Sequence, residues 1–204
     1  MITSLPNLLT LSRIGAIPAI VALFWVDGDA ARWVMLGVYT LACVTDFLDG
    51  YFARTMKIHS NLGQFLDPVA DKLLVGALIF MLVAFDRLSG LSILPGLIIL
   101  CREILVSGLR EFLAELRVSM PVSKLAKWKT TIQMLTLGFL IMGDASPDAI
   151  PSLLIGDIGI WMAAALTLIT GYDYLRVGLT HIIDDEETRD DTPSPRASKT
   201  GEPV

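Results

Sequence analysis

The chain has 204 residues, of which 53% are hydrophobic, and its mean hydropathy is +0.63. These values exclude an ordinary soluble domain and are typical of a polytopic membrane protein. The formal net charge is −5, but residues 182–204 alone hold seven acidic and three basic side chains, so the apolar body is nearly neutral. We therefore expect a membrane domain over residues 1–181 and a disordered acidic tail over residues 182–204.

Six stretches of the chain are long and apolar enough to cross a bilayer, which takes about 20 residues per helix. Before the first of them, Leu5-Pro6-Asn7 and the mixed polar residues that follow predict a short N-terminal interfacial helix. The expected fold class is all-α, with six transmembrane helices. These helices are expected over residues 8–26, 33–53, 64–85, 93–116, 124–143 and 153–177.

The basic residues indicate the orientation, because Lys and Arg are concentrated in cytoplasmic connections. The connections near residues 54–62 and 117–129 carry six Lys or Arg, whereas the three opposite connections hold only Arg32 and Arg87. We expect the basic connections, and with them both termini, to face the cytoplasm.

Polar residues recur on one face of the first helix. Asn7, Thr10 and Arg13 stand at intervals of three, so they share that face. One interpretation is an interfacial anchor, and the other is that this face borders an active site.

Four aspartates stand at the ends of the second and third apolar stretches. Asp46 and Asp49 form one helical pair, and Asp67 and Asp71 form another, since spacings of three and four residues share a face. A charged carboxylate at membrane depth costs about 2.5–3.5 kcal/mol on insertion scales. One such aspartate is most simply a hydrogen-bonded structural group, but four without four basic partners beside them indicate a divalent cation.

Small residues and an arginine follow the first pair of aspartates. Gly50 and Ala53 would let a bulky ligand approach the helix backbone. Arg54 can pair with phosphate through its planar guanidinium, although alone it would be expected to extend to the membrane surface. Beside the aspartates, phosphate binding is the better interpretation.

Basic residues of the fourth and fifth stretches predict a pocket for an anionic substrate. Arg102 and Arg110 are eight residues apart, about 80° around a helix, so both can border one cavity. Lys127 and Lys129 point to different sides, so we expect only one of them to face inward. A salt bridge from Arg102 to Glu103 or an aspartate remains the alternative. Apart from these lysines, the last two stretches look like packing or lipid-facing helices.

The aspartates belong to a longer pattern, D-x2-D-G-x2-A-R-x8-G-x3-D-x3-D, which is the signature of the CDP-alcohol phosphatidyltransferases. The chain resembles that family at all eight fixed positions, Asp46, Asp49, Gly50, Ala53, Arg54, Gly63, Asp67 and Asp71. Further segments resemble the bacterial phosphatidylglycerophosphate synthases within the family. They are Asn7–Arg13, Leu66–Lys72, Arg102–Ile104, Leu109–Glu111 and Lys127–Gln133.

This resemblance implies an enzyme that transfers the phosphatidyl group of CDP-diacylglycerol to sn-glycerol 3-phosphate, giving phosphatidylglycerol phosphate and CMP. It also implies Mg²⁺ or Mn²⁺, as two ions, held by Asp46, Asp49 and Asp67. Asp71 would be the general base and would also touch metal. We expect direct displacement, because no Ser, Cys or His stands in the motif as a covalent nucleophile.

The resemblance also places the substrates and the protein in the cell. The donor CDP-diacylglycerol would contact Asp49, Gly50, Ala53, Arg54 and Gly63. The acceptor phosphate would contact Arg102, Arg110 and Lys127, with Thr10, Arg13 and Lys129 as further candidates. A multi-pass homodimer in the bacterial inner membrane is expected, with its active site facing the cytoplasm.

Three other interpretations remain open. A family member could use another acceptor, such as serine or an inositol phosphate. A divalent-cation transporter would explain the carboxylates but would leave Gly50, Ala53, Arg54 and the basic residues of the fourth and fifth stretches without a purpose. A structural or scaffolding membrane protein would not explain the buried acids.

Overall fold

The structure is a computed structural model, and it describes residues 5–56, 61–115 and 124–190. Within these ranges the chain is all-helical, as expected. Each helix overlaps one of the six predicted apolar stretches. The helices are α1 (Leu5–Leu23), α2 (Asp29–Met56), α3 (Asn61–Ala84), α4 (Ile93–Glu115), α5 (Lys124–Met142) and α6 (Ser152–Asp190), with short 3₁₀ turns η1 (Gly90–Ser92) and η2 (Gly143–Ala145).

Three of the described segments are long and apolar enough to cross a membrane, namely Asp29–Leu48, Gly90–Ala114 and Ser152–Thr180. Asn7–Leu23 is a shorter apolar helix. Both α3 and α5 carry charged side chains near their starts, which shortens their apolar runs. These features make the chain a membrane protein, while the number of spans remains a prediction.

Two boundaries differ from those expected from the sequence. The residues expected to form a separate interfacial helix belong to one continuous helix, α1. At the other end, α6 continues past residue 181 to Asp190, so the first part of the expected tail is helical. Residues 191–204 lie outside the described residues.

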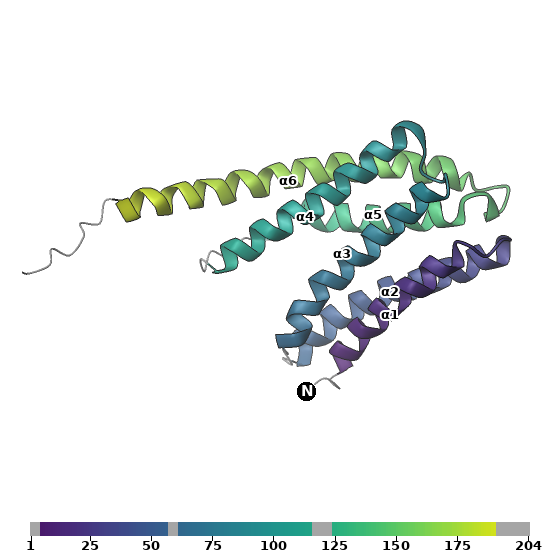
Figure 1. Cartoon of the computed structure of the whole chain (residues 1–204), viewed down its shortest axis with the longest axis horizontal. Helices are drawn as coiled ribbons and strands as arrows, with labels where there is room; N and C mark the ends of the chain where they lie inside the picture. The colour runs from purple at the N-terminus through teal and green to yellow at the C-terminus, as the bar shows by residue number, and fades with distance from the viewer. Residues whose placement is uncertain (1–4, 57–60, 116–123, 191–204) are drawn as a thin grey trace, which may run out of the picture.

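The helices form two groups, α1–α3 and α4–α6 (Figure 1). The groups meet at the end that holds η1 and η2, which we call the joined end. They diverge toward the end that holds the last turns of α2 and the first turns of α3, which we call the open end. The start of α1 and the last turn of α6 also lie toward the open end.

Large apolar side chains from all six helices pack into one buried cluster. In a bilayer such close packing holds helices together, because lipid tails are as apolar as the side chains. The cluster fixes the two groups against each other and leaves the open end free of this apolar filling. Its members include Ile20, Met35, Leu78, Ile99, Ile141 and Ile160, one from each helix in chain order.

Candidate active site

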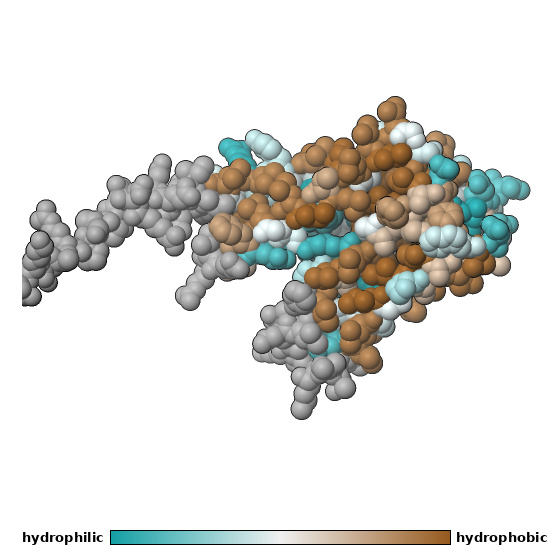
Figure 2. All heavy atoms as spheres, in the orientation of Figure 1, coloured by the Kyte–Doolittle hydropathy of each residue, from teal (hydrophilic) through white to brown (hydrophobic). Residues whose placement is uncertain are grey.

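A polar cavity lies between the two helix groups, and Figure 2 shows hydrophilic residues gathered in the gap between apolar surfaces. It has two overlapping lobes. The acidic lobe, of about 460 Å³, reaches Asp67, and the basic lobe, of about 500 Å³, reaches Lys127 and Lys129. Both lobes are lined by Asp46, Asp71, Arg102, Glu103, Val106 and Arg110.

Carboxylates from α2 and α3 form one wall of this cavity. Asp67 and Asp71 are one turn apart on α3, and Asp46 of α2 joins them along the acidic lobe. Pro68, which follows Asp67 within α3, has no N–H to donate, so the helix lacks one hydrogen bond at this turn. The helical pairing predicted from the spacing therefore brings at least three of the four aspartates to one cavity.

The remaining residues predicted to bind the donor are described only in part. Asp49, Gly50, Ala53 and Arg54 belong to the last turns of α2, and their side chains lie outside the described residues. Gly63 is buried in the first turn of α3. Their assignment to the donor stays a prediction.

Two side chains of α1 contact the aspartates of the acidic wall. The Thr10 hydroxyl donates a hydrogen bond to Oδ1 of Asp67 at 2.5 Å. Arg13 Nη1 lies 2.7 Å from Oδ1 of Asp46, with the arginine side chain 1% exposed and the aspartate 37% exposed. The face of α1 that carries Thr10 and Arg13 thus contacts the acidic wall, which favours the second of the two interpretations left open by the sequence.

The donor atoms of the acidic wall suit a hard divalent cation. Asp46, Asp67 and Asp71 offer only carboxylate oxygens, which Mg²⁺ and Mn²⁺ prefer. Among the described side chains, no group of three or more His, Cys, Asp or Glu residues is arranged to hold an ion, and the side chain of Asp49 is not among them. The chemistry of the wall fits a metal, and its described part alone is not a complete ligand set.

Basic residues from α4 and α5 form the opposite wall. Arg102 and Arg110 both line both lobes, as their spacing predicted. Lys127 and Lys129 both line the basic lobe, so the expectation that only one of them faces inward does not hold. Lys127 is exposed, whereas Lys129 is buried.

Residues of α6 contact Arg102 and fix the position of its side chain. The guanidinium donates to Thr170 Oγ1 at 3.2 Å and lies 5.9 Å from the centroid of the Tyr174 ring, within cation–π range. A Cβ on Gly171 would stand 3.1 Å from Cγ of Arg102, so the missing side chain makes room for it. Arg102 also lies 3.5 Å from Oε1 of Glu103, so it lines the cavity and also forms the ion pair that the alternative interpretation expected. The expectation that α6 only packs or faces lipid is therefore wrong.

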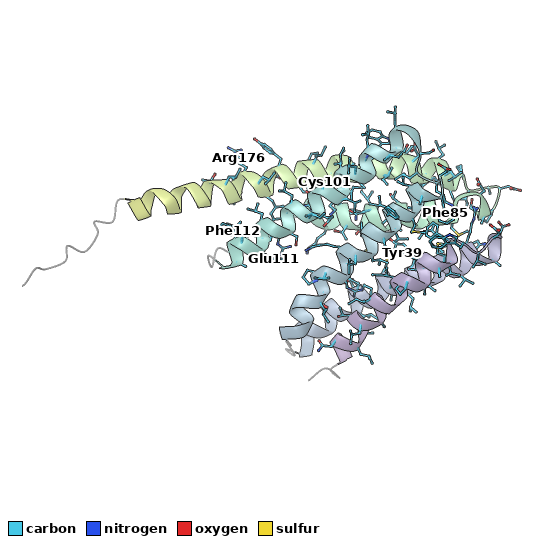
Figure 3. The ribbon with its side chains drawn as sticks, in the orientation of Figure 1. Tyr39, Phe85, Cys101, Glu111, Phe112 and Arg176 are labelled. Atoms are coloured by element: carbon cyan, nitrogen blue, oxygen red, sulfur yellow. The ribbon has the colours of Figure 1, made fainter. Side chains whose placement is uncertain are left out.

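Two acidic residues of α4 neutralise neighbouring lysines. Glu103 pairs closely with the ammonium of Lys129. About two turns further along α4, Glu111 lies 3.8 Å from Lys72 Nζ. Figure 3 shows Glu111 near the end of α4. Ser107, between them, contacts both Lys72 and Glu111. Glu103, Ser107 and Glu111 recur at every fourth position, a spacing that places them on one face of α4 and that is already visible in the sequence.

The chain belongs to the CDP-alcohol phosphatidyltransferase family, whose model matches residues 3–169. Among its relatives, a CDP-diacylglycerol–glycerol-3-phosphate 3-phosphatidyltransferase of Rickettsia bellii is 49% identical over 173 residues, which cover 85% of this chain and 94% of that protein. A protein of Cereibacter sphaeroides with the same description is 37% identical, over 90% of this chain and 99% of that protein. A second form of this transferase from Arabidopsis thaliana is 38% identical, over 86% of this chain and 79% of that protein.

Proposed function

We propose that the protein transfers the phosphatidyl group of CDP-diacylglycerol to sn-glycerol 3-phosphate, releasing CMP and phosphatidylglycerol phosphate. One observation of the site carries the proposal: a wall of carboxylates faces a wall of cations across one cavity at the open end. The first wall suits a metal-bound diphosphate and the second a small phosphorylated acceptor. The relatives carry the name of this transferase.

The acidic wall is assigned to the donor. Members of the family generally depend on a divalent metal, and Asp46, Asp49, Asp67 and Asp71 would hold Mg²⁺ or Mn²⁺, as two ions. When bound, divalent cations stabilise negative charge on phosphoryl oxygens and on the departing nucleotide. Gly50, Ala53, Arg54 and Gly63 are assigned to the CDP-lipid by their place in the signature alone.

The basic wall is assigned to the acceptor. Arg102, Arg110 and Lys127 would bind the phosphate of glycerol 3-phosphate, and Lys129, whose charge is balanced by Glu103, lies beside them. Their combined field attracts a small dianion from the cytoplasm. Since they stand opposite the aspartates, an acceptor held there presents its hydroxyl toward the donor.

Asp71 is assigned as the general base by its place in the family signature, and its position along both lobes supports this assignment. It would take the proton of the acceptor hydroxyl as that oxygen bonds to the lipid-side phosphorus. The bond from this phosphorus to the oxygen of CMP breaks in the same displacement, and CMP leaves with the electron pair. No covalent enzyme intermediate is needed.

We further propose that the protein is a homodimer in the bacterial inner membrane. Each chain would cross it six times and keep the start of α1 at the interface. The membrane domain would extend over residues 1–181, followed by the tail. The open end would face the cytoplasm, where the acceptor is soluble, and the acyl chains of the donor would remain in lipid.

The discriminating experiment supplies the purified protein with CDP-diacylglycerol, Mg²⁺ or Mn²⁺, and one acceptor at a time. We expect CMP release with glycerol 3-phosphate. Release with serine or an inositol phosphate and none with glycerol 3-phosphate would leave the family assignment intact and overturn the acceptor. Ion flux through vesicles without CMP release would favour the transporter.

A further inference from the structure

A second cavity, of about 330 Å³, lies between α2 and α5, and its walls are almost entirely apolar. We call it the α2–α5 cavity. It is lined by Trp33, Leu36 and Tyr39 of α2 and by Leu135, Gly138 and Phe139 of α5, together with the loop after η2. The proposed chemistry uses none of these side chains.

The α2–α5 cavity adjoins the basic lobe of the polar cavity. Cys43 and Met134 line both it and the basic lobe. Cys43 is one helical turn before Asp46, so the apolar cavity begins beside the acidic wall. Tyr39, seen between the helix groups in Figure 3, donates its hydroxyl to the Met134 carbonyl at 2.9 Å, so its polar atom is satisfied inside the protein.

The cavity has the length of one lipid leaflet. From Cys43 to Trp33 the helix rises about 15 Å, at 1.5 Å per residue. The hydrocarbon core of a bilayer is about 30 Å thick, so one leaflet accounts for about 15 Å. An acyl chain that begins beside the aspartates is therefore long enough to extend along the whole cavity.

A folded turn stands at the joined end of the cavity. Pro147 and Ile150 line it, and the Ile150 amide donates to the Pro147 carbonyl at 2.8 Å. Ser146 donates its hydroxyl to the Ile150 carbonyl at 2.9 Å. Trp33 lines the same cavity.

We propose that the α2–α5 cavity holds one acyl chain of the phosphatidyl donor, and that Trp33 and the turn at residues 146–150 limit the length of that chain. The inference rests on the proposed function. An acyl chain is the occupant because the cavity is apolar, opens beside the acidic wall and is as long as a leaflet. It follows that donors are distinguished by a part of the lipid far from the reacting phosphorus.

Gly138 is the position at which to test the proposal. A Cβ there would lie 3.5 Å from Leu36 Cδ1 and 3.8 Å from Tyr39 Cε1, which is ordinary contact, so Gly138→Ala fits. Gly138→Leu extends into the cavity. We expect kcat/KM for long-chain donors to fall about tenfold relative to short-chain donors, the effect of excluding about two methylene groups.

Matched variants separate this effect from a loss of folding. Gly37→Leu makes the same substitution at an exposed position of α2 with no neighbour within 4 Å and is expected to leave the chain-length profile unchanged. Turnover of the short-chain donor reports folding of each variant. Trp33→Ala lengthens the cavity and is expected to shift the preference toward longer chains.

The outcomes distinguish this inference from the proposed function. Glycerol 3-phosphate-dependent CMP release by the unmodified protein is the prerequisite, and its absence would overturn the function itself. If that activity is present but Gly138→Leu slows short and long donors equally, or Trp33→Ala leaves the preference unchanged, the acyl-chain assignment is wrong. A long-chain effect as large in Gly37→Leu would overturn it as well.

Discussion

The ion pair between Glu103 and Lys129 gives the sharpest test of the packing around the site. The Lys129 side chain is 6% exposed and that of Glu103 is 19% exposed, and the two are in close contact. Removing one partner of a buried pair leaves an uncompensated charge, at a cost of about 3–5 kcal/mol. Glu103→Gln is expected at the lower end, near 3 kcal/mol, because the amide oxygen still accepts from Lys129.

The assay is thermal unfolding of the purified protein in detergent, followed by tryptophan fluorescence. For a chain of this size 1 kcal/mol corresponds to about 2–4 °C, so Glu103→Gln is expected to lower Tm by roughly 6–12 °C. Glu111→Gln is the matched control on the same helix, since Glu111 is 74% exposed and 3.8 Å from Lys72. A pair so exposed contributes about 0–1 kcal/mol, or at most about 4 °C.

A second substitution tests the cause. Lys129→Met combined with Glu103→Gln removes both charges of the close pair, and it is expected to recover most of the lost Tm. Arg102, which also lies 3.5 Å from Glu103, keeps its contacts with Thr170 and Tyr174 in this variant. The reasoning would be refuted if Glu103→Gln melts no lower than Glu111→Gln. It would also be refuted if the double variant is as unstable as the single one.

The remaining predictions concern activity. Asp71→Asn is expected to lower turnover about 10²–10⁴-fold while calorimetry still shows donor binding, and normal turnover would remove its assignment as base. Thr10→Val removes the hydrogen bond to Asp67, about 1.5–3 kcal/mol for a charged partner, so kcat/KM is expected to fall about tenfold or more; an unchanged value would make the bond incidental. Gly171→Ala displaces Arg102 and is expected to raise KM for glycerol 3-phosphate with kcat retained; an equal rise for the donor would contradict the two-wall assignment. Chelation is expected to abolish transfer and Mg²⁺ or Mn²⁺ to restore it, and activity that survives chelation would contradict the divalent cation.

The helices could be predicted from the sequence because each apolar run is bounded by charged or turn-forming residues. The shared face of Asp67 and Asp71 was equally predictable, since their spacing of four residues fixes it, whereas the place of Asp46 beside them depends on how α2 and α3 pack. The family signature then supplied the role of these residues. Local signals of this kind need no knowledge of which helices are neighbours.

What the sequence left undecided depends on such neighbours. The pairing of Arg13 with Asp46 and of Thr10 with Asp67 follows from the packing of α1 against α2 and α3. The contacts of Arg102 with α6 could not be predicted from the sequence, because Thr170 and Gly171 are neutral residues in an apolar run. The end of α6 was misplaced because acidic composition predicts solvent exposure and does not by itself exclude a helix.

The two walls of the polar cavity come from different halves of the chain, with acids on α2 and α3 and bases on α4 and α5. The buried cluster fixes these halves at the joined end, away from the reacting atoms. We therefore expect that exchanging one aliphatic side chain of the cluster for another changes the distance between the walls. Substrates bound as proposed would bridge the halves where the protein itself provides little packing, and the ternary complex would complete the bundle.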